Sequence, residues 1–182
     1  MAGPRDTYST VAVILHWGIA LAILAQILLI TAHEATEGPI SREFVEIHKS
    51  LGITILLATL ARIIWRLMNP PPPLPIGMKP WEKIAARAVQ VGFYLLLLVI
   101  PLTGWAAMSA RGRDIIFWGL FNWPLLPIGG GREAARAWMG WHELGVKALY
   151  VLLALHVLAA LKHQFVDRDN VLRTMLPFLP RR

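Results

Sequence analysis

The fold of this chain is decided by the segment WHELGVKALYVLLALH, residues 141–156. It is apolar over most of its length and carries two histidines, His142 and His156, fourteen residues apart. Fourteen residues make nearly four helical turns, so both rings leave the same face of a helix. At a rise of about 1.5 Å per residue, the rings lie roughly 21 Å apart along the axis, near opposite ends of a hydrocarbon core about 30 Å thick. A helix of this kind suits two flat cofactors held one above the other.

The whole chain has the composition of an integral membrane protein. Of its 182 residues 56% are hydrophobic, and no fixed charge occurs in residues 7–32 or in residues 88–110. Each of these runs is long enough to cross a bilayer. The first run is too long for the apolar region of a signal peptide, and no small-residue cleavage site follows it. We therefore interpret it as the first span.

Two further apolar runs are interrupted by charge, one by Arg62 and Arg66 and the other by Lys147 and Lys162. Together the four runs predict an all-α fold, a transmembrane four-helix up-and-down bundle. Short connections favour antiparallel neighbours, and cofactor sites form between the facing helices of such bundles. We expect a single membrane domain over residues 1–182, with spans at about 8–32, 44–68, 84–108 and 138–165.

Two features of the composition exclude other classes of protein. The chain has no cysteine, which excludes a disulfide, a thiolate-bound iron–sulfur cluster and covalently attached haem. The net charge of +7 is explained in a membrane protein by the excess of positive charge on the cytoplasmic side. No feature indicates DNA or RNA as a partner, and membrane lipids are the expected surroundings.

The distribution of lysine and arginine orients the bundle. Eleven of them fall on the side of the N-terminus, the second loop and the C-terminus, and six on the other side, with Lys147 inside the fourth span. Both termini are therefore expected in the cytoplasm. On the outer side we expect an acidic loop over residues 33–46. A glycine-rich loop over residues 109–136 should hold Trp118 and Trp123 in an interfacial aromatic cluster beside a flexible turn.

This topology places four histidines at two depths. His16 lies roughly eight residues inside the cytoplasmic start of span one, and His156 lies roughly nine residues before the cytoplasmic exit of span four, so they share a level. His48 and His142 lie close to the outer starts of their spans and share the opposite level. A single histidine in a span can equally well bond to a neighbouring helix. Two depth-matched pairs favour axial ligation of two iron porphyrins, because neutral imidazole is a usual haem ligand.

Three basic residues are candidate partners of haem propionates. Arg62 follows His48 by fourteen residues and therefore lies on the same face at the depth of the other pair. An arginine at that depth needs a partner, and a carboxylate suits it. Arg66 has the same candidate role, and the alternative for both is an interfacial arginine of the cytoplasmic side. Lys49, beside His48, could meet an outer propionate or extend to the interface.

Two glycines are candidates for close approach of a porphyrin ring. Gly52 lies one turn after His48 on the same face, and Gly104 lies late in the third span. Either position would leave room for a flat ring. Small residues also occur in membrane helices only because they allow close packing, so the pattern leaves both interpretations open.

Two histidines remain outside the pairs. His33 follows His16 by seventeen residues and lies at the outer boundary, so we expect a solvated loop residue. His163 follows His156 by seven residues on the same face, at the cytoplasmic edge. It could bind or protonate a quinone head group at the membrane surface, or it could be an ordinary interfacial histidine beside Lys162.

Several motifs then resemble the bacterial cytochrome b561 family. They are Leu15-His16-Trp17, Ile47-His48-Lys49-Ser50-Leu51-Gly52, Leu60-Ala61-Arg62-Ile63-Ile64-Trp65-Arg66, Pro101-Leu102-Thr103-Gly104-Trp105 and Trp141-His142-Glu143, followed by His156. The resemblance covers nearly the whole chain. It implies a multi-pass four-helix protein of the bacterial inner membrane that binds two haem b groups. The short stand-alone members include superoxide oxidase, which passes electrons from periplasmic superoxide to ubiquinone.

For individual residues, the resemblance implies that His16 and His156 ligate one haem iron and that His48 and His142 ligate the other. One departure concerns the third span, where many family members have a histidine and this chain has Gln90. The departure weakens any transfer of quinone or haem contacts to that position.

Arginines in the outer loop could attract an anionic substrate. Superoxide is an anion, so positive charge at an outer mouth would raise its rate of arrival. The loop contains four arginines despite the positive-inside trend: Arg111, Arg113, Arg132 and Arg136. The alternative is that they are ordinary loop charges paired with Asp114 and Glu133.

Three functional hypotheses follow. The first is a di-haem b conduit that takes electrons at the outer haem and delivers them to ubiquinone, with superoxide as the donor; such a protein is a superoxide:quinone oxidoreductase. The second is a cytochrome b membrane anchor that relays electrons between a dehydrogenase or hydrogenase partner and the quinone pool. The third is a structural or transport membrane protein without a cofactor.

Overall fold

The computed structural model describes residues 7–74 and 77–176, and long helices account for most of them. The helices are α1 (Thr10–Ala35), α2 (Gly38–Met68), α3 (Pro80–Ala110) and α4 (Gly131–Lys162), and α4 continues into a π-helical turn, η1 (His163–Asp167). Each of the four is long and apolar enough to cross a membrane. The predicted all-α architecture with four spans is therefore confirmed.

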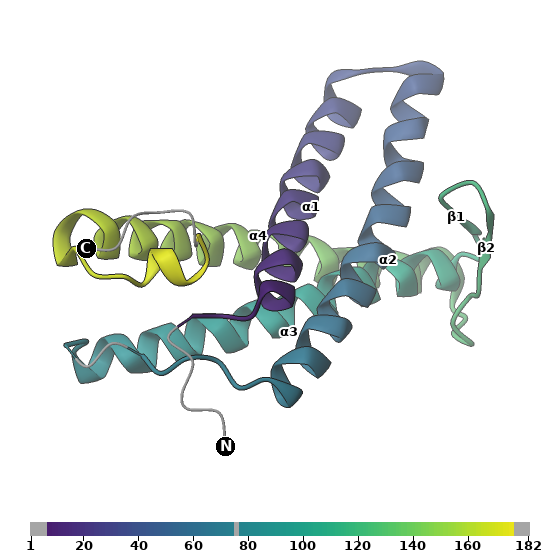
Figure 1. Ribbon diagram of the computed structural model, residues 1–182. Helices are drawn as coiled ribbons and strands as arrows, with labels where there is room; N and C mark the ends of the chain where they lie inside the picture. The colour runs from purple at the N-terminus through teal and green to yellow at the C-terminus, as the bar shows by residue number, and fades with distance from the viewer. Residues whose placement is uncertain (1–6, 75–76, 177–182) are drawn as a thin grey trace.

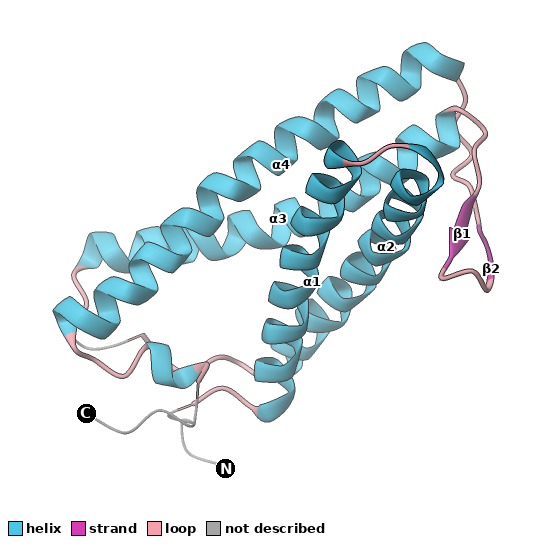
Figure 2. Ribbon diagram, turned by 90° about the horizontal axis from the view of Figure 1, so that it is seen from above, coloured by secondary structure: helices cyan, strands magenta, loops and turns pink. Residues whose placement is uncertain are grey.

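The four helices form two antiparallel hairpins that cross one another. Figure 1 shows α1 beside α2 and α3 beside α4, and the view from above in Figure 2 shows the first hairpin lying across the second. Buried side chains meet in the region of the crossing: Ile19 and Ile23 of α1, Ile55 of α2, Leu97 of α3 and Leu149 of α4. Many large apolar side chains, such as Leu28 and Leu67, remain exposed, as lipid-facing residues do.

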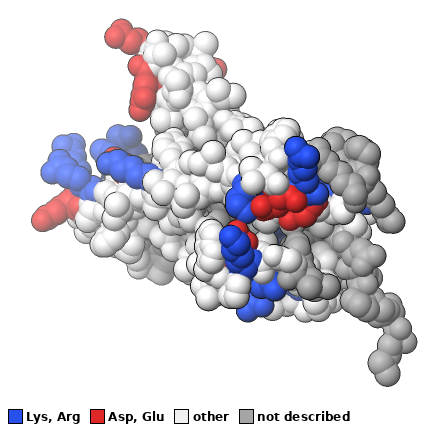
Figure 3. All heavy atoms as spheres, turned by 90° about the vertical axis from the view of Figure 1, so that its left-hand side faces the viewer, with Lys and Arg blue, Asp and Glu red and all other residues white. Residues whose placement is uncertain are grey.

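Charged side chains are grouped apart from this apolar surface. On the face shown in Figure 3, blue and red atoms lie beside one another in separate clusters, and uncharged residues cover the area between the clusters. The segment after η1 runs back to the first half of α1. Trp17 Nε1 of α1 donates a hydrogen bond of 2.8 Å to the carbonyl oxygen of Met175. The described beginning and end therefore lie on the same side of the molecule.

The prediction of an acidic loop over residues 33–46 is wrong. Helix α2 already begins at Gly38, and only Thr36 and Glu37 separate it from α1. His33 is accordingly not a solvated loop residue but lies half-buried in the last turn of α1. Its Nδ1 is 2.7 Å from Ser41 Oγ and 3.1 Å from the carbonyl oxygen of Ser41, so it ties the end of α1 to the start of α2.

The expected flexible turn between α3 and α4 is also corrected, because part of it is a β-hairpin. Strands β1 (Ile115–Phe117) and β2 (Phe121–Trp123) pair antiparallel, with Ile116 opposite Asn122. The turn places Trp118 at φ 51° and Gly119 at φ 73°. The expected aromatic cluster is present, since the Phe117 and Trp123 rings lie 5.3 Å apart and the Trp105 and Trp123 rings 5.8 Å apart.

The hairpin is attached to α2 beside His48. Ser50 Oγ donates to the carbonyl oxygen of Ile116 at 3.1 Å and accepts the backbone N–H of Trp118 at 3.0 Å. Trp118 Nε1 donates to Thr54 Oγ1 at 3.0 Å. Because Ser50 is only 2% exposed, its two bonds are shielded from water, and together with the Trp118–Thr54 bond they fix the hairpin over this part of α2.

Candidate functional site

The structure brings the four span histidines together in the two pairs expected from their depths. His16 of α1 faces His156 of α4, with ring centroids 6.1 Å apart and an interplanar angle of 65°. His48 of α2 faces His142 of α4 at the same centroid distance and an angle of 74°. The first hairpin thus contributes one histidine to each pair, and α4 contributes the other. We name them the inner pair, His16 with His156, and the outer pair, His48 with His142.

The separation within each pair suits one metal ion between the two rings. Metal–nitrogen bonds to histidine are about 2.0–2.1 Å, and a ring nitrogen lies about 1.1 Å from the ring centre, which places two facing centroids about 6.2–6.4 Å apart. Each observed centroid distance is 6.1 Å. An iron porphyrin supplies four equatorial nitrogens itself and takes two axial ligands. The donor set of each pair therefore fits that group.

His142 is oriented from behind by α3. Its Nδ1 lies 2.8 Å from the carbonyl oxygen of Ile100, so Nδ1 carries the hydrogen and Nε2 keeps a lone pair that could bind a metal. A Cβ atom on Gly104 would lie 3.1 Å from His142 Nδ1 and 3.3 Å from its Cε1. The close approach at Gly104 is therefore to the His142 ring, which differs from the expected approach of a porphyrin.

Gly52 has a similar role on the other side of the outer pair. A Cβ atom on Gly52 would meet the Nε2 atom of Gln26 at 3.4 Å. Gln26 Nε2 also donates a hydrogen bond of 3.0 Å to the carbonyl oxygen of His48. The neighbour that the structure gives Gly52 is thus a side chain of α1. Sequence reasoning missed Gln26, because its partners depend on how α1 packs against α2.

The inner pair is bordered by an arginine and an aromatic ring. Arg62 Nη1 donates to the carbonyl oxygen of Ala12, one turn before His16, at 3.0 Å. The Phe93 ring lies 5.4 Å from the His156 ring, in an edge arrangement. The structure therefore places Arg62 at the depth that the sequence predicts, beside the first turns of α1.

Arg66 has partners within the protein. Its Nη2 donates to Gln90 Oε1 at 2.8 Å, and its guanidinium carbon lies 5.9 Å from the centre of the Tyr94 ring. Gln90, at the position where this chain departs from many of the proteins it resembles, is thus the hydrogen-bond acceptor for Arg66. The Gln90 amide accepts one of the guanidinium N–H groups of Arg66, and the Tyr94 ring makes a cation–π contact with it.

Lys49 also has partners, and these differ from the expected propionate. Its Nζ lies 2.6 Å from Glu46 Oε2 and 3.5 Å from the carbonyl oxygen of Asp114. The contact with Asp114 joins α2 to the segment that precedes β1. Lys49 therefore supports the attachment of the hairpin to α2.

The outer arginines are exposed, at the end of α3 and the start of α4: Arg111, Arg113, Arg132 and Arg136. Within residues 7–74 and 77–176, none of the four side chains makes an ion pair or a hydrogen bond. The expected alternative, pairing with Asp114 and Glu133, is not observed there. Their charge is free to act on an approaching anion.

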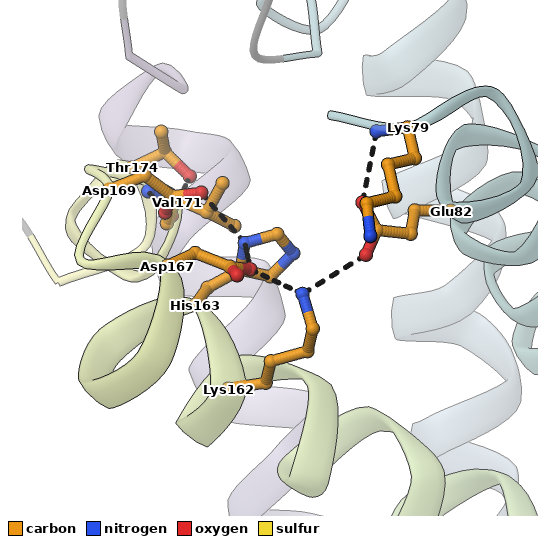
Figure 4. A network of polar contacts seen from close by, with 8 residues as sticks. All are labelled: Lys79, Glu82, Lys162, His163, Asp167, Asp169, Val171 and Thr174. Carbon is orange, nitrogen blue, oxygen red and sulfur yellow. Dashed lines mark hydrogen bonds and ion pairs between the residues drawn. The ribbon is translucent and has the colours of Figure 1, made fainter. Parts of the chain in front are cut away.

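His163 belongs to a polar network that joins α4 to α3 (Figure 4). Its Nδ1 lies 2.7 Å from Asp169 Oδ2 and 3.2 Å from Asp167 Oδ2. Lys162 Nζ lies 2.6 Å from Asp167 Oδ2 and 3.0 Å from Glu82 Oε1 of α3. Sequence reasoning missed the acidic members, although the spacing of His163 and Asp167 by four residues in a helix was a usable signal.

Comparison with known proteins shows which sequences resemble this chain. The family model of prokaryotic cytochrome b561 matches residues 7–178. The chain is 36% identical to cytochrome b561 homolog 2 of Escherichia coli (strain K12), over 72% of this chain and 69% of that protein. It is 31% identical to the probable superoxide oxidase CybB of Yersinia pestis, over 93% and 96%. A probable Ni/Fe-hydrogenase B-type cytochrome subunit of Bradyrhizobium diazoefficiens is 28% identical, over 58% and 40%.

Proposed function

Since this chain belongs to the prokaryotic cytochrome b561 family, which serves b-type haem electron transfer in the bacterial membrane, we propose that it holds two haem b groups. His16 and His156 would ligate the inner iron, and His48 and His142 the outer iron. The observation that carries this proposal is the pair of 6.1 Å ring separations, both using the continuous helix α4. When bound, haem supplies one-electron chemistry.

The residues of the protein set the positions of the two sites. Along α4 the ligands His142 and His156 are separated by about 21 Å of helix, so one site lies toward each side of the bilayer. Arg62, beside the inner pair, is the proposed partner of an inner propionate. Arg66 is a second candidate, and it would share its guanidinium between Gln90 and a propionate.

The proposed reaction is superoxide oxidation on the periplasmic side coupled to ubiquinone reduction. Two superoxide anions each lose one electron and become dioxygen, while one quinone gains two electrons and two protons and becomes quinol. The likeness to the probable superoxide oxidase CybB extends over 93% of this chain. The exposed outer arginines favour an anionic donor, because positive charge raises the local concentration of anions.

The quinone is proposed to bind at the inner end, on the side of both termini, which we place in the cytoplasm. The excess of lysine and arginine on that side supports this orientation. His163 lies there at the end of α4 with its Nδ1 held by Asp169, so Nε2 is available for a quinone oxygen.

The test uses the full-length protein purified in detergent. We expect reduced-minus-oxidised spectra with b-type bands, about two haems per chain, and quinone reduction when superoxide is generated in solution. A sample without b-type bands would overturn the haem proposal. A sample that has both haems but reacts slowly with superoxide would overturn only the choice of donor.

A second candidate function keeps the haems and makes the chain the membrane anchor of a dehydrogenase or hydrogenase. The similarity to a hydrogenase B-type cytochrome subunit favours it. However, the match covers only 40% of that subunit, compared with 96% of the probable superoxide oxidase. Co-purification of a large soluble redox partner, with no superoxide activity in the isolated chain, would favour the anchor. The cofactor-free alternative is set aside because the family binds b-type haem.

A further inference from the structure

The two histidines of the outer pair differ in how their second ring nitrogen is satisfied. His142 Nδ1 bonds to the carbonyl oxygen of Ile100. His48 Nδ1 is buried, and within the described residues it has no hydrogen-bond partner. If Nε2 of His48 is a metal ligand, Nδ1 must carry a hydrogen, and a buried N–H without an acceptor costs about 1–3 kcal/mol. The site therefore requires an acceptor near His48.

Gln26 of α1 supplies a matching unpartnered atom. Its Nε2 donates to the carbonyl oxygen of His48 at 3.0 Å, which fixes the orientation of the amide because an oxygen cannot face that carbonyl. Its Oε1 is buried and, among the described residues, lacks a donor. A buried acceptor and a buried potential donor thus belong to two residues that are already hydrogen-bonded to each other.

The absence of a side chain at Gly52 leaves room for the Gln26 amide to contact the backbone of α2. The carbonyl oxygen of His48 points along the helix toward residue 52, four positions later. Gly52 has no side chain to cover this carbonyl, and the Gln26 amide nitrogen lies 3.4 Å from the place of a Cβ atom there. The amide is consequently held within the turn that carries the His48 ring.

We propose that Gln26 is the positioning residue of the outer ligand His48: its Oε1 accepts the Nδ1 hydrogen of His48 when Nε2 coordinates iron. The inference rests on the proposed haem function. The Gln26 amide already bonds to the backbone carbonyl of His48, which keeps its Oε1 beside that residue. The bond from Nδ1 to Oε1 selects the tautomer with free Nε2, and it makes the imidazole a more basic ligand. A more basic ligand stabilises the oxidised iron and lowers the reduction potential of the outer haem.

The test is a redox titration of the visible spectrum of the full-length holoprotein, with the outer component assigned as the one that His142→Ala removes. Gln26→Leu and Gln26→Met both remove the acceptor and keep a side chain of similar size. We expect the ratio of oxidised to reduced outer haem at a fixed solution potential to fall about tenfold in Gln26→Leu, a shift of about 59 mV for one electron. The ratio should fall similarly in Gln26→Met, and the inner component should not move in either variant.

Gln90→Leu is the matched control. It makes the same substitution on α3, where the Gln90 amide accepts a hydrogen bond from Arg66 and, among the described residues, contacts neither residue of the outer pair. We expect its outer component to titrate as in the wild type. Circular dichroism and the bound haem content show that each variant is folded and loaded.

Three outcomes have distinct meanings. A similar rise of the outer potential in the Leu and Met variants, with the inner potential unchanged, supports the role of Gln26. Unchanged potentials in variants that keep both haems overturn it and indicate a backbone carbonyl of α2 as the acceptor. A wild-type protein without haem overturns the proposed function itself, which separates that failure from a failure of the Gln26 inference.

Discussion

The ring of His142 occupies the space that a side chain on Gly104 would fill, since a Cβ atom there would lie 3.1 Å from His142 Nδ1. The same ring is held by the carbonyl oxygen of Ile100 in the preceding turn of α3. Helix α3 contributes no histidine to either pair, yet it fixes the position of the His142 ring of α4.

Enlarging residue 104 should therefore displace His142. We expect Gly104→Val to remove the outer haem, so that bound haem falls from about two groups per chain to about one. Gly104→Ala should have a smaller effect, because the ring needs to move by only a few tenths of an ångström. Pyridine haemochrome assay and the visible spectrum measure both. Gly140→Ala on α4 is the control, since nothing lies within 4 Å of its Cβ position; loss of haem in that variant would contradict this explanation.

Each span histidine should control one haem only. We expect His16→Ala and His156→Ala to remove the inner component, and His48→Ala and His142→Ala to remove the outer one, because a bis-histidine site loses an axial ligand in each case. Redox-titrated spectra distinguish the components.

His33→Ala is the control for this series. His33 bonds to Ser41 at the α1–α2 turn and belongs to neither pair, so both components should remain, with some loss of thermal stability. If one variant of a pair removed a component and its partner did not, the pairing would be wrong.

The spans and the pairing could be predicted because they depend on local regularities. Length and hydropathy indicate where the chain crosses the membrane, and the helical repeat places His142 and His156 on one face. The depth of each histidine then follows from the topology. The predicted helix ends are less accurate than the predicted spans. Helix α2 begins at Gly38, because the acidic segment before Glu46 is part of the helix and not of a loop.

The hairpin and the supporting residues could not be predicted, because their partners lie on other helices. Ser50 bonds to Ile116, 66 positions away, and no local pattern specifies that contact. The contacts of Gln26 with His48 and of Gly104 with His142 form only when α1 packs on α2 and α3 packs on α4. The sequence predicts a propionate as the partner of Arg66, and no local pattern indicates that Gln90 accepts a hydrogen bond from this arginine.

Removing the Ser50 hydroxyl should loosen the hairpin. The Ser50→Ala variant loses two shielded hydrogen bonds, to Ile116 and Trp118, and we expect a loss of about 1–2 kcal/mol in stability. Thermal unfolding in detergent and chymotrypsin cleavage between α3 and α4 measure it. Asn122→Ala, exposed in the same hairpin, should change stability by less than about 0.5 kcal/mol. Equal protease resistance in Ser50→Ala and the wild type would contradict the attachment.

Neutralising the outer arginines should slow the reaction with superoxide without altering the haems. We expect replacement of Arg111, Arg113, Arg132 and Arg136 by Gln to lower kcat/KM for superoxide roughly tenfold at low ionic strength, because positive charge at the outer end no longer concentrates the anion. The wild-type value should fall toward that of the variant as salt is added, since exposed charges are screened over about 10 Å at 0.1 M. Lys79→Gln with Lys83→Gln is the control, because both lysines lie at the start of α3, at the other end of that helix from Arg111. A wild-type rate that does not depend on salt would argue against electrostatic attraction, and so would an equal loss in the lysine control.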